Sequence, residues 1–373
     1  IAEEVIKETL AVYPKSVIHL WLAGRVQRLK KDVMGSINIF SDCVAHSASL
    51  QSSLPQLKHF ALYDLAQSYL AKSMWENARS CFEVLERESV WSKKFYAYAQ
   101  GCCLDMLKKH DEAVVCYLRS ATQPSIKLGG KTISVDQFVK RRTEQMFRVQ
   151  KTLTGFAPGS PKLPKLTGSI NLTKVPGIEL AMLFNMFTQS EPADVETMLA
   201  LTTEARKAAA DSYGIPLDVA TEAPLAEGAT SPGSDGVAAA ADTVDETKAD
   251  PSSPASPASG ASETPVAADD DAIADGETGE ELPIDAYADE QIEQLRHEEV
   301  LVLTLMRATL LRELGRYDEA REEYHSVEKP FRLKSKKPEF ETWVLPYGYY
   351  EHAVLLYRAG DEAGCVDMIE NKL

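Results

Sequence analysis

The stretch that decides the fold is Leu305–Val327, which reads LMRATLLRELGRYDEAREEYHSV. Ala308 precedes Ala320 by twelve residues, and Tyr324 follows four residues after that. Gly315 lies between the two alanines, and glycine readily adopts the left-handed backbone that ends a helix. The stretch therefore predicts a helical hairpin whose two helices cross closely where the small side chains meet.

The same spacing of small, small and large residues recurs along the chain. It occurs as Ala23, Gly35 and Ile39; as Ala66, Ala78 and Phe82; as Gly101, Ala113 and Tyr117; and as Ala353, Cys365 and Ile369. A small residue at the eighth position, alanine at the twentieth and an aromatic residue near the twenty-fourth are typical of tetratricopeptide repeats. We therefore predict an all-α fold, a solenoid of tetratricopeptide-like hairpins.

The acidic charge of the chain gathers in one segment. The 373 residues carry a formal net charge of −16, and residues 218–285 hold 17 acidic residues against Lys248 alone. Residues 214–286 contain eight prolines and no aromatic residue or cysteine. Such a composition buries too little apolar surface to offset chain entropy, so we predict a long disordered acidic loop that interrupts the solenoid.

Composition divides the chain into four parts. Residues 1–153 are predicted to be helical repeats followed by a basic helix, and residues 154–213 a loop and a helix pair that continue the solenoid. Residues 214–286 form the predicted insertion, and residues 287–373 form further repeats, the last of them cut short. Because the chain begins with Ile1, we expect a fragment or a processed form.

The sequence lacks the motifs of the common enzyme classes. Gly129-Gly130-Lys131-Thr132 resembles the end of a phosphate-binding loop, but Ser125 stands where the motif needs its first glycine. The six cysteines form no C-x-x-C pair, and no histidines have ligand spacing. We therefore predict a non-enzyme with no catalytic residue, cofactor or metal, and with buried, reduced thiols.

A basic stretch stands out between residues 127 and 174, where ten lysines and arginines face only Asp136 and Glu144. Such a surface can bind anionic lipid head groups or acidic peptide segments. The candidate contacts are Lys140, Arg141, Arg142 and Arg148. Nucleic acid is not expected, since no aromatic residues interleave in a recognisable module. The alternative is a solvated face, or one folded against the acidic segment of the same chain.

Three segments resemble those of a known family. They are Glu88-Ser89-Val90-Trp91-Ser92-Lys93, Leu128-Gly129-Gly130-Lys131-Thr132 and Val175-Pro176-Gly177-Ile178-Glu179. Together with the repeat at Leu314–Ala320, they resemble the tetratricopeptide repeat protein 39 family, which includes the fungal inclusion body clearance protein. The resemblance covers most of residues 50–213 and 287–373 and fails over 214–286. Family members usually carry a further helical region before the position of Ile1.

The resemblance implies a non-enzymatic protein that acts through protein partners. It implies a cytoplasmic location, with the nucleus, the mitochondrial outer membrane and lipid droplets as further sites. It also implies roles in lipid homeostasis and in the clearance of inclusion bodies. It carries over no catalytic residue, and it leads us to expect that Trp91 anchors one repeat on the next.

We therefore predict an adaptor or scaffold that holds a partner's segment on its helical surface. Exposed positions of the first helices are the candidate partner-binding residues: Gln67 and Lys72 in one copy, Arg307 and Arg312 in another. The alternative is a peripheral membrane or lipid-droplet-surface protein that uses the basic stretch 127–174.

Overall fold

The computed structural model describes residues 2–47, 55–160, 168–217, 285–334 and 340–372. All of these belong to one compact unit, which spans residues 1–225 and 279–373. A second unit, residues 226–278, lies outside the described residues. The predicted disordered insertion, 214–286, also lies outside them except at its two ends.

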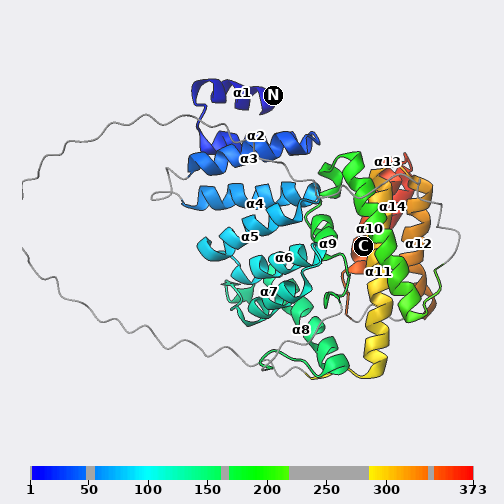
Figure 1. The fold of residues 1–373 in the computed structure, drawn as a ribbon. Helices are drawn as coiled ribbons and strands as arrows, with labels where there is room; N and C mark the ends of the chain where they lie inside the picture. Colours follow the sequence, from blue (N-terminus) through cyan, green and yellow to red (C-terminus); the bar gives the residue numbers. More distant parts are fainter. Residues whose placement is uncertain (1, 48–54, 161–167, 218–284, 335–339, 373) are drawn as a thin grey trace, which may run out of the picture. The chain divides into compact units, whose positions relative to one another are not determined.

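The described residues fold almost entirely into helices (Figure 1). The first seven are α1 (Ala2–Val12), α2 (Val17–Leu29), α3 (Val33–Ser47), α4 (Pro55–Ala71), α5 (Trp75–Glu88), α6 (Lys93–Met106) and α7 (His110–Thr122). There follow α8 (Ser134–Thr154), α9 (Pro176–Leu183), a 3-10 turn η2 (Phe187–Gln189), α10 (Pro192–Tyr213), α11 (Asp289–Glu313), α12 (Tyr317–Lys334), α13 (Val344–Arg358) and α14 (Glu362–Lys372). The predicted all-α fold is confirmed.

Five helical hairpins occur within the described ranges: α2–α3, α4–α5, α6–α7, α11–α12 and α13–α14. Each of their turns contains one residue with positive φ, namely Lys31, Ser73, Lys108, Gly315 and Gly360. In each turn, the backbone amides of this residue and of the next one donate to carbonyls in the last turn of the first helix. One example is Arg316 N, which donates to Leu311 O at 3.0 Å. This arrangement is the Schellman motif, which satisfies the last carbonyls of a helix. The five turns are therefore equivalent and fix the register of the repeat.

Three of the copies lie in the predicted register. Ala66, Ala78 and Phe82 are fully buried, and so are Ala308, Ala320 and Tyr324. In the copy that begins at Gly101, a Cβ on the glycine would lie 2.5 Å from the Tyr117 ring. The close crossing that the small residues predicted is therefore present in all three, since no larger side chain would fit.

The first copy is shifted by one residue from the prediction. Its left-handed turn residue, Lys31, lies five residues before Ser36, as Gly315 lies five residues before Ala320. The repeat is therefore Gly24, Ser36 and Phe40 rather than Ala23, Gly35 and Ile39. A Cβ on Gly24 would lie 2.6 Å from the Phe40 ring, so the close crossing is there. Two adjacent small residues, Ala23 and Gly24, made the sequence ambiguous.

The last copy keeps the predicted register, but its large residue is not enclosed. Ala353 is buried, whereas Ile369 is half-exposed on α14. Its neighbour Met368 turns into the core instead. No described helix follows α14 to cover the outer side chain.

The segment between the third and fourth hairpins positions the candidate site. Gly129 and Gly130, with φ of 59° and 80°, close a hairpin of β1 (Lys127–Leu128) and β2 (Lys131–Thr132), where the sequence predicted only a turn. After α8, the chain returns as α9, which packs against α6 and α4. Helix α10 then packs along α11 (Figure 1).

Candidate functional site: a groove on the first helices

The first helices of the first three hairpins, α2, α4 and α6, share one face, which we call the first-helix face. On α6 this face is filled by the chain itself, because residues 169–175 and α9 lie on it. Ser169 Oγ donates to Asp105 Oδ2 at 2.6 Å, and Tyr117 Oη donates to the same oxygen at 2.7 Å. Gly177 of α9 sits so close to Trp75 that a Cβ would lie 2.8 Å from the ring. The third repeat therefore holds a segment of its own chain.

On α2 and on the part of α4 that α9 leaves uncovered, the same face is open and forms a groove of about 350 Å³. The groove begins where α9 ends, so it continues the surface that α9 covers on α6. We name it the first-helix groove, and its lining side chains are Trp21, Arg25, Arg28, Leu29, Phe60, Tyr63, Asp64, Gln67, Phe184, Met186 and Gln189. Its volume lies near the lower end of the range of ligand pockets, which is about 300–1,000 Å³.

A buried ion pair makes the floor of the groove rigid. The Arg28 guanidinium bonds both the carboxylate and the backbone carbonyl of Asp64, the latter at 2.7 Å. Trp21 Nε1 donates to the other carboxylate oxygen at 2.7 Å, and Arg28 Nε donates to Gln189 Oε1 at 3.0 Å. Burial lowers the pKa of Arg28, and the Asp64 carboxylate opposes that shift. Because these polar groups bond one another, they hold the Trp21 indole in place and are not available to bind a ligand themselves.

The rim of the groove is aromatic and carries one cation. Phe60 and Leu29 are exposed, and the Phe60 and Trp21 ring centroids lie 6.2 Å apart. The exposed Arg25 guanidinium lies over the Trp21 ring, 5.1 Å from its centroid. Tyr63 meets Phe184 edge to face at 5.9 Å, and burial raises the pKa of Tyr63. Exposed aromatic side chains beside a cation suit an apolar side chain with a nearby acidic group.

Of the four predicted partner-binding residues, only Gln67 lies in the groove. Lys72 is half-buried and pairs with Asp194 at 2.9 Å and Glu191 at 3.4 Å, joining α4 to the start of α10. The expectation that Arg307 and Arg312 are exposed is wrong, since both are buried. Arg307 pairs with Glu323 of α12, and Arg312 pairs with Glu351 of α13.

The four residues predicted to contact lipid or an acidic partner do not share a surface. Lys140 and Arg141 are exposed on α8. Arg142 is buried between Glu179 of α9 and Glu341, so its predicted contact with a lipid head group is wrong. Arg148 is half-buried, with its guanidinium 5.5 Å from the Tyr287 ring centroid. The two partly or fully buried arginines hold α8 to the rest of the unit instead.

The sequence did not single out the aromatic residues of the groove. Trp21 belongs to the first copy, whose predicted register was one residue out. Trp91, which was expected to anchor two repeats, is half-exposed, so that expectation is wrong. The buried tryptophan of this repeat is Trp75, at the opposite end of α5, which packs against α9. A signal was available, because Trp21 lies three residues before the small residue Gly24, just as Tyr63 lies three before Ala66.

A second pocket of about 350 Å³ lies at the ends of α8, α10 and α11. Its aromatic residue, Tyr213, donates to Glu299 at 2.6 Å and lies under Arg296, so it is already engaged. Among the residues described, no group of three or more side chains could hold a metal ion. None of the described helices is both long and apolar enough to cross a membrane.

The repeated hairpins, their equivalent turns and the open first-helix groove define a tetratricopeptide-like helical-repeat protein. Proteins of this class generally bind protein partners and are generally non-catalytic. The family model for Iml2/Tetratricopeptide repeat protein 39 matches residues 1–219, more than half of the chain. The chain therefore belongs to this family, which confirms the resemblance. No solved structure matches it.

Proposed function

We propose that this chain is a non-enzymatic scaffold that holds a segment of a partner protein in the first-helix groove. One observation carries the proposal: the same face is filled by the chain's own segment on α6 and part of α4, and is open on α2 and the rest of α4. The filled part demonstrates how the face holds a segment, through apolar contact and side-chain hydrogen bonds. The open part presents Trp21, Phe60 and Arg25 without such a segment.

The groove favours a segment with an apolar anchor and an acidic group beside it. Phe60 and Trp21 would pack on the anchor, and Arg25 would pair with the carboxylate at the rim. Aromatic residues and arginine are the side chains that most often dominate binding energy at protein interfaces. We further propose that the scaffold acts in lipid homeostasis or in the clearance of inclusion bodies, in the cytoplasm. Family membership supports this setting.

A selection of peptides tests the scaffold proposal. Random twelve-residue peptides displayed on phage are selected against the whole chain, and the enriched peptides are synthesised for titration. We expect an apolar residue near an acidic one in the enriched sequences. We also expect Phe60→Ala and Arg25→Glu each to weaken binding by about tenfold or more, which is the usual range for residues that dominate an interface.

Matched variants lie away from the groove. Tyr357 is an exposed aromatic residue on α13, and Arg321 is a partly exposed arginine on α12. Tyr357→Ala and Arg321→Glu should bind the selected peptides as the parent chain does. Peptides that bind all four variants equally would place the binding surface elsewhere and refute the groove.

The cellular setting is tested by complementation. Cells that lack the gene receive the parent chain, the Phe60→Ala and Arg25→Glu double variant, or the Tyr357→Ala control. If the setting is right, the double variant fails to restore neutral-lipid content and inclusion clearance, while the control restores both. Full restoration by the double variant would separate these processes from the groove.

A further inference from the structure

Two neighbouring connections, the α5–α6 loop and the β1–β2 hairpin between α7 and α8, expose large apolar side chains to solvent. In the loop between α5 and α6, Val90 is 88% exposed and Trp91 50%, and in the β1–β2 hairpin Leu128 is 73% exposed. Single exposed apolar residues are common on protein surfaces, but three on two adjoining loops form a group. None of them lines the first-helix groove or the pocket at the ends of α8, α10 and α11.

The two loops are joined by one buried carboxylate, Asp136 of α8. Ser92 Oγ donates to Asp136 Oδ1, and the backbone amide of Ile126 donates to Asp136 Oδ2 at 2.7 Å. Ser92 Oγ also accepts from the backbone amide of Phe95 at 3.0 Å and so caps α6. The loop of Trp91 and the hairpin of Leu128 are therefore fixed side by side, as one platform.

The platform is basic. Lys93, Lys127 and Lys131 are exposed, and none of them forms an ion pair within the part of the chain that the structure describes. The acidic groups nearby are engaged. Glu88 pairs with Lys58 at 2.7 Å. Asp136 is buried, and its two carboxylate oxygens accept from Ser92 and Ile126.

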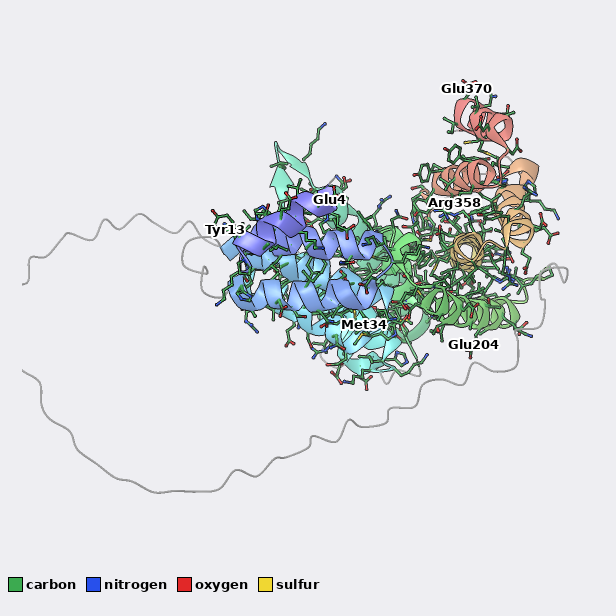
Figure 2. All side chains as sticks on the ribbon, turned by 90° about the horizontal axis from the view of Figure 1, so that it is seen from above. Glu4, Tyr13, Met34, Glu204, Arg358 and Glu370 are labelled. Carbon is green, nitrogen blue, oxygen red and sulfur yellow. The ribbon has the colours of Figure 1, made fainter. Side chains whose placement is uncertain are left out.

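The position of the platform leaves it accessible. Because successive helices run in alternate directions, the α5–α6 loop and the β1–β2 hairpin lie at one edge of the stack (Figure 1). The loop between α1 and α2 lies at the same edge and exposes Val12 and Tyr13, with Lys15 beside them. Figure 2 shows Tyr13 at the end of α1 that leads into this loop.

We propose that this edge, with Val90, Trp91 and Leu128 at its centre, binds the surface of an anionic lipid bilayer. Val90 and Leu128 enter the boundary between head groups and acyl chains, Trp91 lies at the head-group level, and the three lysines face lipid phosphates. Three features favour a bilayer: protruding tips rather than a pocket, a tryptophan, which prefers the membrane interface, and unpaired lysines beside apolar residues. This inference concerns a different surface from the groove and does not depend on the proposed scaffold function.

Vesicle flotation tests the proposal with the whole chain. The vesicles contain phosphatidylcholine alone or with 30 mol% phosphatidylserine, at low salt and at 0.5 M salt. We expect flotation with the phosphatidylserine vesicles at low salt, strongly reduced at high salt because the charges are screened. Lys127→Gln and Lys131→Gln should each weaken binding about fivefold, the effect of about one lysine near an anionic surface.

The apolar tips provide the sharper test. Val90→Ser with Leu128→Ser should weaken binding by about tenfold or more, since both side chains leave water in the bound state. Val115→Ser on α7 and Lys372→Gln on α14 remove an exposed apolar and an exposed basic residue elsewhere, and should change nothing. Trp91 emission should shift to the blue on vesicles, and this shift should be lost in Trp91→Phe. All these positions are exposed, so unchanged circular dichroism is expected and is checked.

Two results would overturn the inference. One is the absence of flotation at low salt with phosphatidylserine vesicles. The other is flotation that depends on the lysines but not on Val90, Leu128 or Trp91, together with equal binding of a poly-glutamate peptide. That second pattern would mean that the edge binds an acidic protein surface and not a membrane.

Discussion

Single residues set how closely the helices of a repeat approach. At the eighth repeat position, glycine or alanine meets the aromatic ring that lies sixteen residues later, as Gly24 meets Phe40 and Gly101 meets Tyr117. These rings are fully buried and leave no room for a larger group. The size of the eighth residue is therefore dictated by the ring opposite it.

Gly24→Ala tests the corrected register of the first repeat. A methyl group 2.6 Å from the Phe40 ring must force the two helices apart, because the ring is enclosed. Overpacking of this kind lowers the free energy of unfolding by about 1–3 kcal/mol. Denaturation in guanidinium chloride measures the change.

Gly35→Ala is the matched control, since Gly35 is the residue that the uncorrected register would place at a crossing. A Cβ there would meet only the side chain of Asp32, which is exposed but accepts from the Gly35 amide at 2.9 Å and so caps α3. We expect a loss of about 1 kcal/mol or less, the usual cost of disturbing such a cap and smaller than that of Gly24→Ala. If Gly35→Ala costs more than Gly24→Ala, the corrected register is wrong.

The thiols give a second prediction at this scale. Cys365 is half-buried, whereas the other five cysteines are buried. Burial raises the pKa of Cys43 to about 11 and that of Cys81 to about 12. Burial also raises the pKa of Cys102 and of Cys103. At pH 8 a thiol with a pKa of about 11 is about one thousandth thiolate, and the thiolate is the reactive form.

We therefore expect the folded chain to react with Ellman's reagent at pH 8 through one thiol, Cys365. All six should react once guanidinium chloride unfolds the chain. Cys365→Ser should abolish the fast reaction and leave the slow one unchanged. Rapid reaction of two or more thiols in the folded chain would contradict the burial of the other five.

At the scale of elements, one ion pair recurs between neighbouring hairpins. Arg28 lies at the twelfth repeat position and pairs with Asp64, which lies at the sixth position of the next repeat. Arg312 and Glu351 occupy the same two positions in the last two hairpins. In both cases the guanidinium also bonds the backbone carbonyl of the acidic residue. Between the second and third hairpins these positions hold Leu70 and Ala99, both fully buried.

Arg312→Leu should be strongly destabilising, because it leaves Glu351 buried without its cation. Breaking a buried pair from one side costs about 3–5 kcal/mol, whereas replacing both partners by apolar groups is often near neutral. Adding Glu351→Ala to Arg312→Leu should therefore recover part of the loss, as at Leu70 and Ala99. The recovery is partial because the buried Glu313 side chain also loses Arg312, at 2.9 Å, and keeps only Arg358 among the described residues. Urea denaturation of the two single variants and the double variant measures the coupling.

The comparison is with an exposed pair on the neighbouring helix α12. Arg321 and Asp318 lie 3.3 Å apart in solvent, and such pairs contribute little to stability. Arg321→Leu should leave the unfolding curve unchanged. Additive losses in the Arg312 and Glu351 cycle would mean that the buried residues do not act as a pair.

At the scale of the whole molecule, Arg142 connects three segments that are distant in sequence. Its guanidinium lies between Glu179 of α9 and Glu341, which precedes α13. Thr173 Oγ1 donates to Glu179 at 3.0 Å, and Trp343 Nε1 donates to Glu341 at 2.6 Å. Burial raises the pKa of Glu179 above its ordinary value, and Arg142 opposes that shift.

Arg142→Leu should therefore give a pH-dependent loss of stability. Without the cation, the pKa of Glu179 rises further in the folded state, so the folded chain binds more protons than the unfolded one. Stability then increases as the pH falls through the raised pKa. We expect the gap in melting temperature between the variant and the parent chain to narrow from pH 7.5 to pH 5.5. Arg141→Leu, at the exposed neighbouring position, should show no such trend, and a gap that widens toward acid would contradict the assignment.

The hairpins could be predicted from sequence because their signal is local. A small residue, a turn residue and a large residue at fixed spacing specify a crossing within about thirty residues, whatever surrounds it. The register failed only where Ala23 and Gly24 are adjacent, because both satisfy the spacing and only the Phe40 ring distinguishes them.

The site could not be predicted in the same way, because exposure depends on distant segments. Arg307 and Arg312 occupy helix positions that face solvent unless α12 and α13 cover them. Arginine is rarely buried without a partner, and the partners lie on other helices. Likewise, nothing local to α2 or α4 indicates that α9 covers only part of α4 and leaves the groove open. The first-helix groove therefore became visible only with the packing of the chain.

The segment that lies on α6 has a consequence for how many ligands the array can take. Because residues 169–183 are attached to the helix they cover, their effective concentration at that face is of the order of millimolar or higher. A separate peptide of similar affinity must exceed that concentration before it displaces them. Among the first three repeats, the third is therefore occupied by the chain itself. The first-helix face can then bind one outside segment at a time, in the groove of α2 and α4.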